Sequence, residues 1–298
     1  SGDSGEKAIE EVSAMLMEAE REFSRFRADS AVSEINAQAG IAPVEAPEEV
    51  FEVLRQGLAG SAQSGGLFQL TIAPLADLWD IMSDSPRVPR ADEISNALSY
   101  VDDSQVVLDE EAGTVFLTRP GISLDLGALV KGYAAGKARE IYLENGVESA
   151  LLSLGGMVVT VGERPDGQPF SIGLRDPEGS ASDLYGTLAA DGRIISTSGG
   201  YERYFEQDGQ IYHHILDPRT GYPADSGLLS VTVLCGDGMQ ADFLSTYLFI
   251  AGEDAVREHL NETDYSVIAV TEEREVLLSD DLKERFSLTE DAGCTLAE

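Results

Sequence analysis

The chain has 298 residues, of which 43% are hydrophobic and 25% are charged, so it is long enough and apolar enough to bury a globular core. Its formal net charge of −34 argues against a nucleic-acid-binding protein, because phosphates would be repelled. The same charge argues against docking on anionic lipid through a basic face.

Cysteines and targeting signals say little about the compartment. Cys235 and Cys294 are too few for a disulfide framework, and whether they pair is left open. No apolar run reaches the length of a membrane span, and no signal peptide is visible. The first residues read like a trimmed or mature chain, so the compartment cannot be read from them.

In the first half of the chain, apolar spacing and turn residues predict mainly helices. We expect helices over about 6–23, 47–58 and 92–98, strands over 105–109 and 114–118, and a strand, a glycine turn and a long helix over 122–146. Residues 24–40 read as a polar loop. The glycines of 64–66 either let the backbone approach a ligand or end a helix.

In the second half, strands dominate. We expect strands within 150–162 and 170–177, a hairpin at Asp191-Gly192, a type I′ hairpin at Asp208-Gly209, a strand over 229–234, helices over 239–251 and 254–260, and a hairpin over 265–278. The tail 291–298 is expected to be loosely ordered. Strands joined by tight turns, with helices inserted in blocks, predict an α+β fold with antiparallel sheets and helices packed on them.

The clearest chemical signal is the pair Asp242 and Thr246. Their spacing of four residues places both side chains on one face of the predicted helix. A carboxylate and a hydroxyl are hard oxygen ligands that suit Mg²⁺ or Ca²⁺. The alternative is purely structural: a carboxylate that favours the helix dipole and a threonine that fills space.

The adjacent histidines, His213 and His214, precede a rigid turn that contains Asp217, Pro218 and Gly221. A base held beside a hard-metal site is what phosphoryl or nucleotidyl transfer needs. Histidines in a strand are also common as structural residues, and spacing alone does not decide between the two. His259 lies in a charged helix and is expected at the surface.

Three glycine turns could admit a ligand to the backbone. In LDLGALVKG, Asp125 is expected to end a strand and Lys131 to enter a helix N-terminus, a combination that suits a phosphate. SLGG (153–156) and STSGG (196–200) follow apolar strands and are short turns of small residues. Each is also an ordinary turn when taken alone.

Taken together and in order, these motifs resemble the ApbE family of FAD:protein FMN transferases over about residues 10–280. The resemblance is carried by SRFRADSAVSEIN, LFQLTIAPLADLW, LDLGALVKGYA, LLSLGG, STSGGYERYF, HHILDPRTGYP and MQADFLSTYLF. It implies a single catalytic domain of T-fold-like α+β architecture, outside the cytoplasm and often anchored as a lipoprotein. It further implies FAD as substrate, Mg²⁺ as metal, a Thr or Ser hydroxyl of an acceptor protein as the site of FMN attachment, and AMP as leaving group.

The resemblance also implies roles for individual residues. Mg²⁺ would be held by Asp242, Thr246 and the main-chain oxygen of Ala128, His214 would be the general base, and Asp217 would orient that region. The nucleotide and flavin would contact Phe26, Ser33, Asn36, Phe68, Gln69, Leu70, Asp125, Lys131, Gly155, Gly156, Ser198, Gly199 and Leu216.

The chain departs from the family pattern at several positions. It has no first strand with a Met-Gly-Thr motif, and Gln69, Met157 and Gly136 stand where polar or acidic residues are usual. These departures keep two alternatives open: an enzyme that hydrolyses FAD to FMN and AMP, and a flavin-binding protein without turnover.

Overall fold

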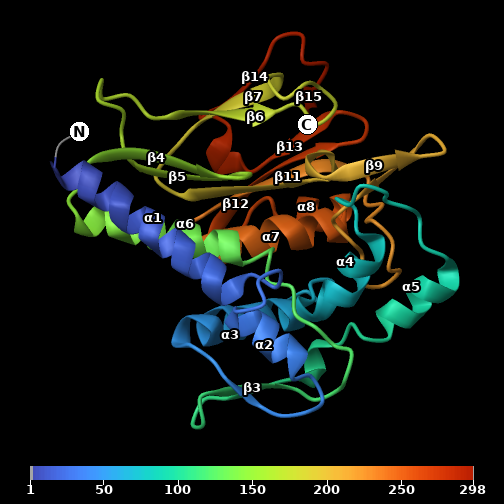
Figure 1. Cartoon of the computed structure of the whole chain (residues 1–298). Coiled ribbons are helices and arrows are strands. Elements are labelled where there is room, and N and C mark those ends of the chain that lie inside the picture. The colour runs from blue at the N-terminus through green and yellow to red at the C-terminus, as the bar shows by residue number, and fades with distance from the viewer. Residues whose placement is uncertain (1–2, 298) are drawn as a thin grey trace. The chain divides into compact units, whose positions relative to one another are not determined.

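The computed structural model describes residues 3–297, which divide into two compact units (Figure 1). Unit 1 comprises the described residues within 1–15, 131–201 and 225–298. Unit 2 comprises residues 16–130 and 202–224. Each unit is therefore built from separate stretches of the chain.

Unit 1 contains a seven-stranded sheet in the order β15-β13-β12-β11-β8-β5-β4. Its strands are β4 (Ser149–Leu154), β5 (Met157–Gly162), β8 (Ile194–Gly199), β11 (Leu228–Cys235), β12 (Tyr265–Thr271), β13 (Glu275–Leu278) and β15 (Thr295–Leu296). All neighbours are antiparallel except β13 and β15. A second sheet has the order β14-β7-β6, from β6 (Ser171–Arg175), β7 (Leu184–Ala189) and β14 (Phe286–Leu288).

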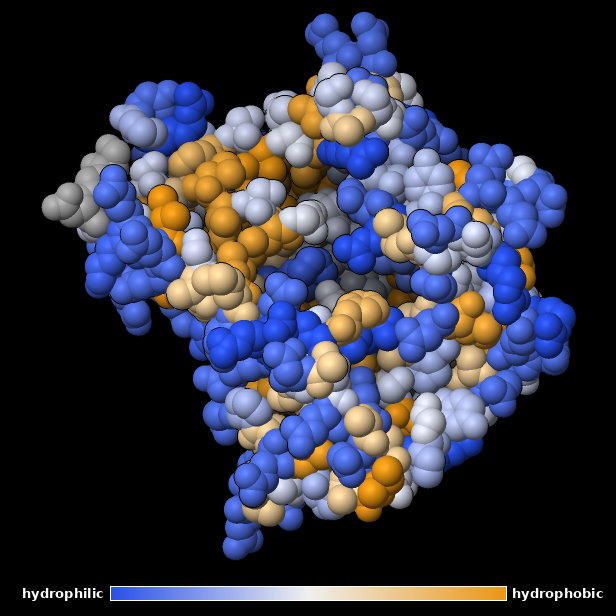
Figure 2. All heavy atoms as spheres, viewed as in Figure 1, coloured by the Kyte–Doolittle hydropathy of each residue, from blue (hydrophilic) through white to orange (hydrophobic). Residues whose placement is uncertain are grey.

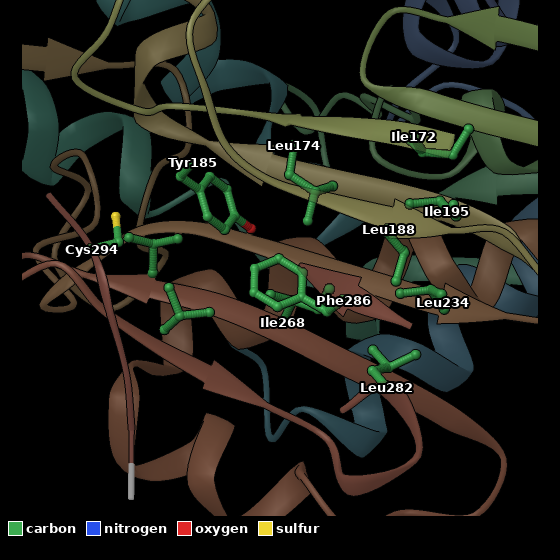
Figure 3. Packing of buried hydrophobic residues seen from close by; sticks show 12 residues of the cluster. Ile172, Leu174, Tyr185, Leu188, Ile195, Leu234, Ile268, Leu282, Phe286 and Cys294 are labelled. Carbon is green, nitrogen blue, oxygen red and sulfur yellow. The ribbon is translucent and has the colours of Figure 1, made fainter. Parts of the chain in front are cut away.

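The two sheets enclose the main core of unit 1, which Figure 3 shows from close by. Side chains of β6 and β7 meet side chains of β8, β11 and β12 there, and Tyr185 and Phe286 lie 6.1 Å apart between ring centroids. Burial raises the pKa of the Tyr185 hydroxyl well above its usual value. The interior between the sheets is thus apolar and closed to water.

Helices cover the other face of the seven-stranded sheet. These are α6 (Val130–Glu144), α7 (Gly238–Ala251) and α8 (Glu253–His259). Ala135 of α6 packs against Met157, Val159 and Ile194 of the sheet. Most of α7 is buried, as expected for a helix that is apolar around its circumference.

Unit 2 is mainly helical. Its elements are α2 (Ala31–Ala37), α3 (Glu48–Gln63), α4 (Ala73–Trp79), α5 (Ala91–Leu98), the sheet β1-β3-β2 (Val44–Glu45, Thr114–Leu117, Val106–Asp109) and the hairpin β9-β10 (Tyr204–Gln207, Gln210–His213). The helix α1 (Asp3–Phe23) begins in unit 1 and ends in unit 2. Short 3₁₀ turns cover 70–72, 103–105, 200–202 and 280–282.

The α+β class and most elements are as predicted, including the type I′ hairpin, where Asp208 and Gly209 have φ of 55° and 76°. Three predictions were wrong. Residues 24–40 contain α2, capped by the Ser30 hydroxyl. No strand forms over 122–126. Asp191-Gly192 does not close a hairpin, because β7 and β8 belong to different sheets. In the tail, Thr295 and Leu296 pair with β13 as β15, and the expectation of loose order there stays a prediction.

Smaller points were also settled by the structure. The glycines 65 and 66 follow the end of α3, as a helix-ending signal would. Both cysteines are free thiols, and burial raises the pKa of each. His259 is half-buried beside the rings of Tyr247 and Tyr265 rather than at the surface.

Figure 2 shows that hydrophilic side chains cover most of the visible face, with hydrophobic side chains gathered over β4 and β5. Leu151 on the edge strand β4 is 49% exposed. Within the described residues, no helix is both long enough and apolar enough to cross a membrane.

Candidate active site

The candidate site in unit 1 is built around the carboxylate of Asp242, which is only 2% exposed. It lies on α7, whose first turn is capped by the side chain of Asp237 through the N–H of Gln240. The backbone N–H of Gly132 donates to Oδ2 at 3.1 Å. Nζ of Lys131, the second residue of α6, lies 3.0 Å from Oδ1 and 3.3 Å from Oδ2. A buried carboxylate is therefore balanced by one ammonium group and one main-chain donor.

A chain of hydroxyl groups connects Asp242 with Thr246. Ser196 Oγ lies 3.4 Å from Oδ1 of Asp242 and 3.2 Å from Ser245 Oγ. Ser245 Oγ lies 2.9 Å from Ser198 Oγ, which lies 3.3 Å from Thr246 Oγ1. Ser245 also donates to the main-chain oxygen of Asp242 at 3.1 Å. Because the Ser245 hydroxyl has one proton and gives it to that carbonyl, it accepts from Ser198, while Ser196 gives its own single proton to Asp242.

This donor set fits a hard divalent cation in its chemistry. Asp242 and Thr246 both offer oxygen atoms from the first turns of α7, as their spacing predicted. Among the described residues there is no group of three or more His, Cys, Asp or Glu side chains that could hold a metal. The structure thus offers one carboxylate with hydroxyl and main-chain oxygens, rather than a cage of carboxylates.

Glycine turns border this part of unit 1. Gly155 and Gly156 join β4 to β5 with φ of 51° and 88°, and a Cβ on Gly156 would lie 3.3 Å from the Thr197 oxygen. A Cβ on Gly199 would lie 2.4 Å from the ring of Tyr201. Glycine is therefore needed at 199 because an aromatic ring lies against the backbone there.

Unit 2 holds the two histidines in different environments. The Nε2 atom of His213 lies 3.1 Å from the Ala224 carbonyl, and its Nδ1 accepts from the N–H of Ile215 at 3.3 Å. Burial lowers the pKa of His213, against a smaller raising effect from the Ala224 carbonyl. Both ring nitrogens of His213 are thus engaged by the backbone, which describes a structural histidine.

His214 is exposed. Its main-chain N–H donates to the Arg203 carbonyl at 3.1 Å, and its Nδ1 lies 3.3 Å from the same oxygen. Since a carbonyl can only accept, this contact favours the tautomer that carries the proton on Nδ1. The lone pair then lies on Nε2, where it can accept a proton.

Asp217 fixes the turn that follows the histidines. Its carboxylate accepts from the Arg219 N–H at 2.8 Å and from the Arg219 guanidinium at 2.7 Å. The turn is anchored elsewhere by the Trp79 indole, which donates to the Gly221 carbonyl at 2.7 Å. Leu216, beside Asp217, bridges to Pro223 and packs in the cluster around Trp79. These contacts give Asp217 a positioning role within the turn.

The remaining residues expected near the flavin form a framework in unit 2. The side chain of Asn36 makes the hydrogen bonds with Leu124 that a neighbouring strand would otherwise make. It donates to the Leu124 carbonyl at 3.1 Å and accepts from the Leu124 N–H at 2.7 Å. Ser33 donates to the Arg25 carbonyl at 3.1 Å. The N–H of Asp125 donates to the Leu70 carbonyl at 2.8 Å. The absence of a strand at Asp125 is explained by this side-chain pairing.

Phe68 and Leu70 are buried in the interior, so neither side chain is presented to solvent. Gln69 accepts from the Asp103 N–H at 3.1 Å, and the Asp103 carboxylate in turn accepts from the N–H groups of Leu70 and Thr71, each at 2.9 Å. These contacts hold the segment in place from within. Ala128 lies in the turn that leads into α6.

Arg25, which the sequence pattern did not single out, forms ion pairs with Asp125 and Asp77. Arg25 pairs with Asp125 at 2.8 Å and with Asp77 at 2.6 Å. Burial alone would lower the pKa of Arg25, but the two carboxylates outweigh it and raise the pKa. The Arg25 guanidinium lies 4.3 Å from the ring centroid of Phe26, which is 82% exposed. Phe26 thus presents an aromatic face that is available for stacking.

Comparison with known proteins gives a consistent result. The sequence model of the ApbE family matches residues 4–270. A protein of Klebsiella pneumoniae named FAD:protein FMN transferase is 42% identical over 88% of this chain and 81% of its own length. A protein of the same name from Treponema pallidum is 35% identical, over 82% and 71%. The crystal structure of the ApbE protein of Thermotoga maritima has a TM-score of 0.87, 31% identity, and coverage of 96% and 93%.

Proposed function

We propose, because this chain belongs to the ApbE family, that it is an FAD:protein FMN transferase that attaches FMN to a Thr or Ser hydroxyl of an acceptor protein. In this reaction the hydroxyl oxygen forms a bond to the phosphorus of the FMN half. The bond between that phosphorus and the bridging oxygen breaks, and its electron pair leaves with AMP. The hydroxyl proton passes to a base.

We place the proposed metal at the carboxylate of Asp242. Asp242, Thr246 and the main-chain oxygen of Ala128 would hold Mg²⁺, which supplies positive charge to pyrophosphate oxygens when it is bound. The observation that supports this assignment is the burial of Asp242 with a cationic group 3.0 Å from its Oδ1 atom. The hydroxyl chain through Ser198 would hold Thr246 in place.

His214 is assigned as the base. A hydroxyl is a weak nucleophile until its proton is removed, so a group that accepts that proton is needed. The contact of His214 with the Arg203 carbonyl favours a lone pair on Nε2, whereas both nitrogens of His213 are engaged by the backbone. The observation that favours His214 over His213 is exposure: His214 is exposed, whereas burial lowers the pKa of His213.

The test is an incubation with FAD, Mg²⁺ and an acceptor that carries an Asp-x-x-Thr/Ser-Gly-Ala-Thr/Ser type motif, followed by intact-mass spectrometry and quantification of AMP. We expect one FMN added to the acceptor for each AMP released, and no addition in EDTA. Asp242→Asn and His214→Ala should lose transfer by at least about a hundredfold. Asp254→Asn, a change of the same kind in the first turn of α8, should keep it.

Other outcomes would point to other functions. AMP release without labelling of any acceptor would support a pyrophosphatase that gives FMN and AMP. Bound but unchanged FAD after long incubation with Mg²⁺ would support a binding protein without turnover. Full transfer by Asp242→Asn would remove the metal assignment.

We also propose an extracytoplasmic location, with attachment to the membrane through a lipid where the protein is anchored. The support is the family resemblance together with the acidic composition, and nucleic acid is not expected as a partner. Cell fractionation would test this, together with digestion of the expressed protein by protease added outside the cells. A protease-protected cytosolic product would contradict it.

A further inference from the structure

The ion pair between Lys131 and Asp242 joins a partly exposed ammonium group to a buried carboxylate. Asp242 is 2% exposed, whereas the side chain of Lys131 is 41% exposed. The Lys131 ammonium contacts both carboxylate oxygens, at 3.0 and 3.3 Å. It therefore occupies the side of Asp242 from which a cation would approach.

A divalent cation and this ammonium group compete for the same oxygen atoms. Mg²⁺ binds oxygen at about 2.0–2.1 Å, so a metal on Oδ1 would lie within a few ångströms of the present position of Nζ. Two cations so close repel each other strongly in a partly buried site. Metal binding thus requires Lys131 to move, while removal of Lys131 without a metal would leave a buried carboxylate short of positive charge.

The surrounding backbone allows Lys131 to leave without releasing Asp242. The N–H of Gly132 holds Oδ2 at 3.1 Å, and a main-chain donor cannot swing away as a side chain can. The Lys131 stem is long and flexible, and its ammonium is suited to phosphate oxygens. The carboxylate therefore keeps its orientation whichever cation neutralises it.

We propose that Lys131 is a built-in counter-cation of Asp242 that the metal displaces and that moves onto the FAD pyrophosphate, so that metal and nucleotide bind cooperatively. The inference rests on the proposed function for the identity of the nucleotide and the metal. Without nucleotide, Lys131 weakens metal binding. With nucleotide, the phosphates draw Lys131 away, and the metal binds more tightly. Because coupling is reciprocal, the metal must strengthen FAD binding by the same factor.

The first measurement is Mn²⁺ binding to the purified chain without FAD or acceptor, by the electron paramagnetic resonance signal of free Mn²⁺. Lys131→Met should bind Mn²⁺ at least about fivefold more tightly than the wild type. Lys131→Arg, which keeps the charge, should bind as weakly as the wild type. Lys137→Met is the matched control on the same helix, where Lys137 pairs with Glu140, and it should stay within about twofold.

The second measurement is FAD affinity with and without Mn²⁺, by flavin fluorescence, read before any AMP is formed. The factor by which Mn²⁺ tightens FAD should be smaller in Lys131→Met than in the wild type by the same ratio as in the first measurement. Some coupling will remain, because metal and phosphate also attract each other directly. If Lys131→Met does not fold, Lys131→Gln gives the same test, since it is neutral and can still donate to Asp242.

The two proposals fail separately. Equal or weaker Mn²⁺ binding by the neutral Lys131 variants would overturn the displacement idea even if FMN transfer occurs. Tighter Mn²⁺ binding with reduced coupling would support it even if no acceptor is ever labelled.

Discussion

Gly132 and Gly238 face each other where the first turns of α6 and α7 meet, and neither has room for a side chain. A Cβ on Gly132 would lie 2.2 Å from the Gly238 carbonyl oxygen, and a Cβ on Gly238 would lie 2.2 Å from the Gly132 oxygen. This backbone-to-backbone contact is what brings the Gly132 N–H within 3.1 Å of Asp242. Two glycines thus position the carboxylate of the proposed metal site.

Gly132→Ala should therefore destabilise the protein and disturb the site together. The new methyl group would overlap main-chain atoms, which cannot rotate away, so we expect a loss of at least about 1–3 kcal/mol in the free energy of unfolding. Urea denaturation measures it. Gly136→Ala is the control on the same helix: apart from its chain neighbours and the nearby backbone of α6, no atom would lie within 4 Å of the new Cβ, and alanine should stabilise the helix by up to about 1 kcal/mol. Equal stability of the two variants would contradict the contact.

Asn36→Ala should loosen the segment before α6. The mutation removes both hydrogen bonds to Leu124, so the N–H and the C=O of that residue each lose this partner, and we expect a loss of about 1–3 kcal/mol in the free energy of unfolding. Hydrogen exchange should show faster exchange of the Leu124 amide. Asn96→Ala, at an exposed position of α5, is the control and should change neither quantity. Unchanged exchange in Asn36→Ala would mean that the pairing contributes nothing.

His213 should make the protein less stable in mild acid. Its pKa in the folded chain lies below the ordinary 6.5, so the unfolded chain binds more protons as the pH falls through this range. The stabilising contribution is present above about pH 6.5 and is lost as the pH falls through the lowered folded pKa, by at most about 1.4 kcal/mol per pH unit. Urea denaturation of the wild type and His213→Gln between about pH 7 and 5 compares the slopes. Parallel profiles would exclude this role.

Asp217→Ala should reduce FMN transfer through the turn that follows His214. The change removes the acceptor of the Arg219 N–H and of its guanidinium. Because Arg219 is largely exposed, the ion pair itself is worth little, and the main-chain hydrogen bond is the larger loss. Asp217→Asn keeps that acceptor and should retain most activity, with the transfer rate and urea denaturation measured in parallel. Equal loss in both variants would indicate that the charge of Asp217 acts directly.

The sequence predicted elements well where one local pattern determines them. Apolar spacing located α1, α5 and α7, and the Asp208-Gly209 turn located the β9-β10 hairpin. The hairpin predicted at Asp191-Gly192 was wrong because the flanking strands pair with other, distant strands. β7 pairs with β6 and β14, whereas β8 pairs with β5 and β11, so the turn connects two different sheets. Turn chemistry specifies a reversal of the chain but not the partners of its two strands.

The candidate site was predictable only in part, for the same reason. Asp242 and Thr246 share a helix, so their spacing revealed them. Lys131 was assigned to phosphate, and nothing in the sequence indicates its pairing with Asp242, 111 residues away. Ser196 and Ser245 were missed because serines within an apolar strand and helix have no distinctive spacing. The expectation of a single catalytic domain stays a prediction.

The register of β8 and β11 has a consequence for how this protein is put together. Gly199, the last residue of β8, is paired with Ser230 in the neighbouring strand, so the chain departs from the ladder and rejoins it at adjacent positions. Everything between these points, including the histidines, is an excursion that the sheet does not need for its own continuity. A short loop could replace residues 202–224 and leave the hydrogen-bonded pairs intact. The constraints on residues 202–224 therefore come from their packing in unit 2, including the cluster around Trp79 and the turn at Asp217, and not from the β8-β11 ladder.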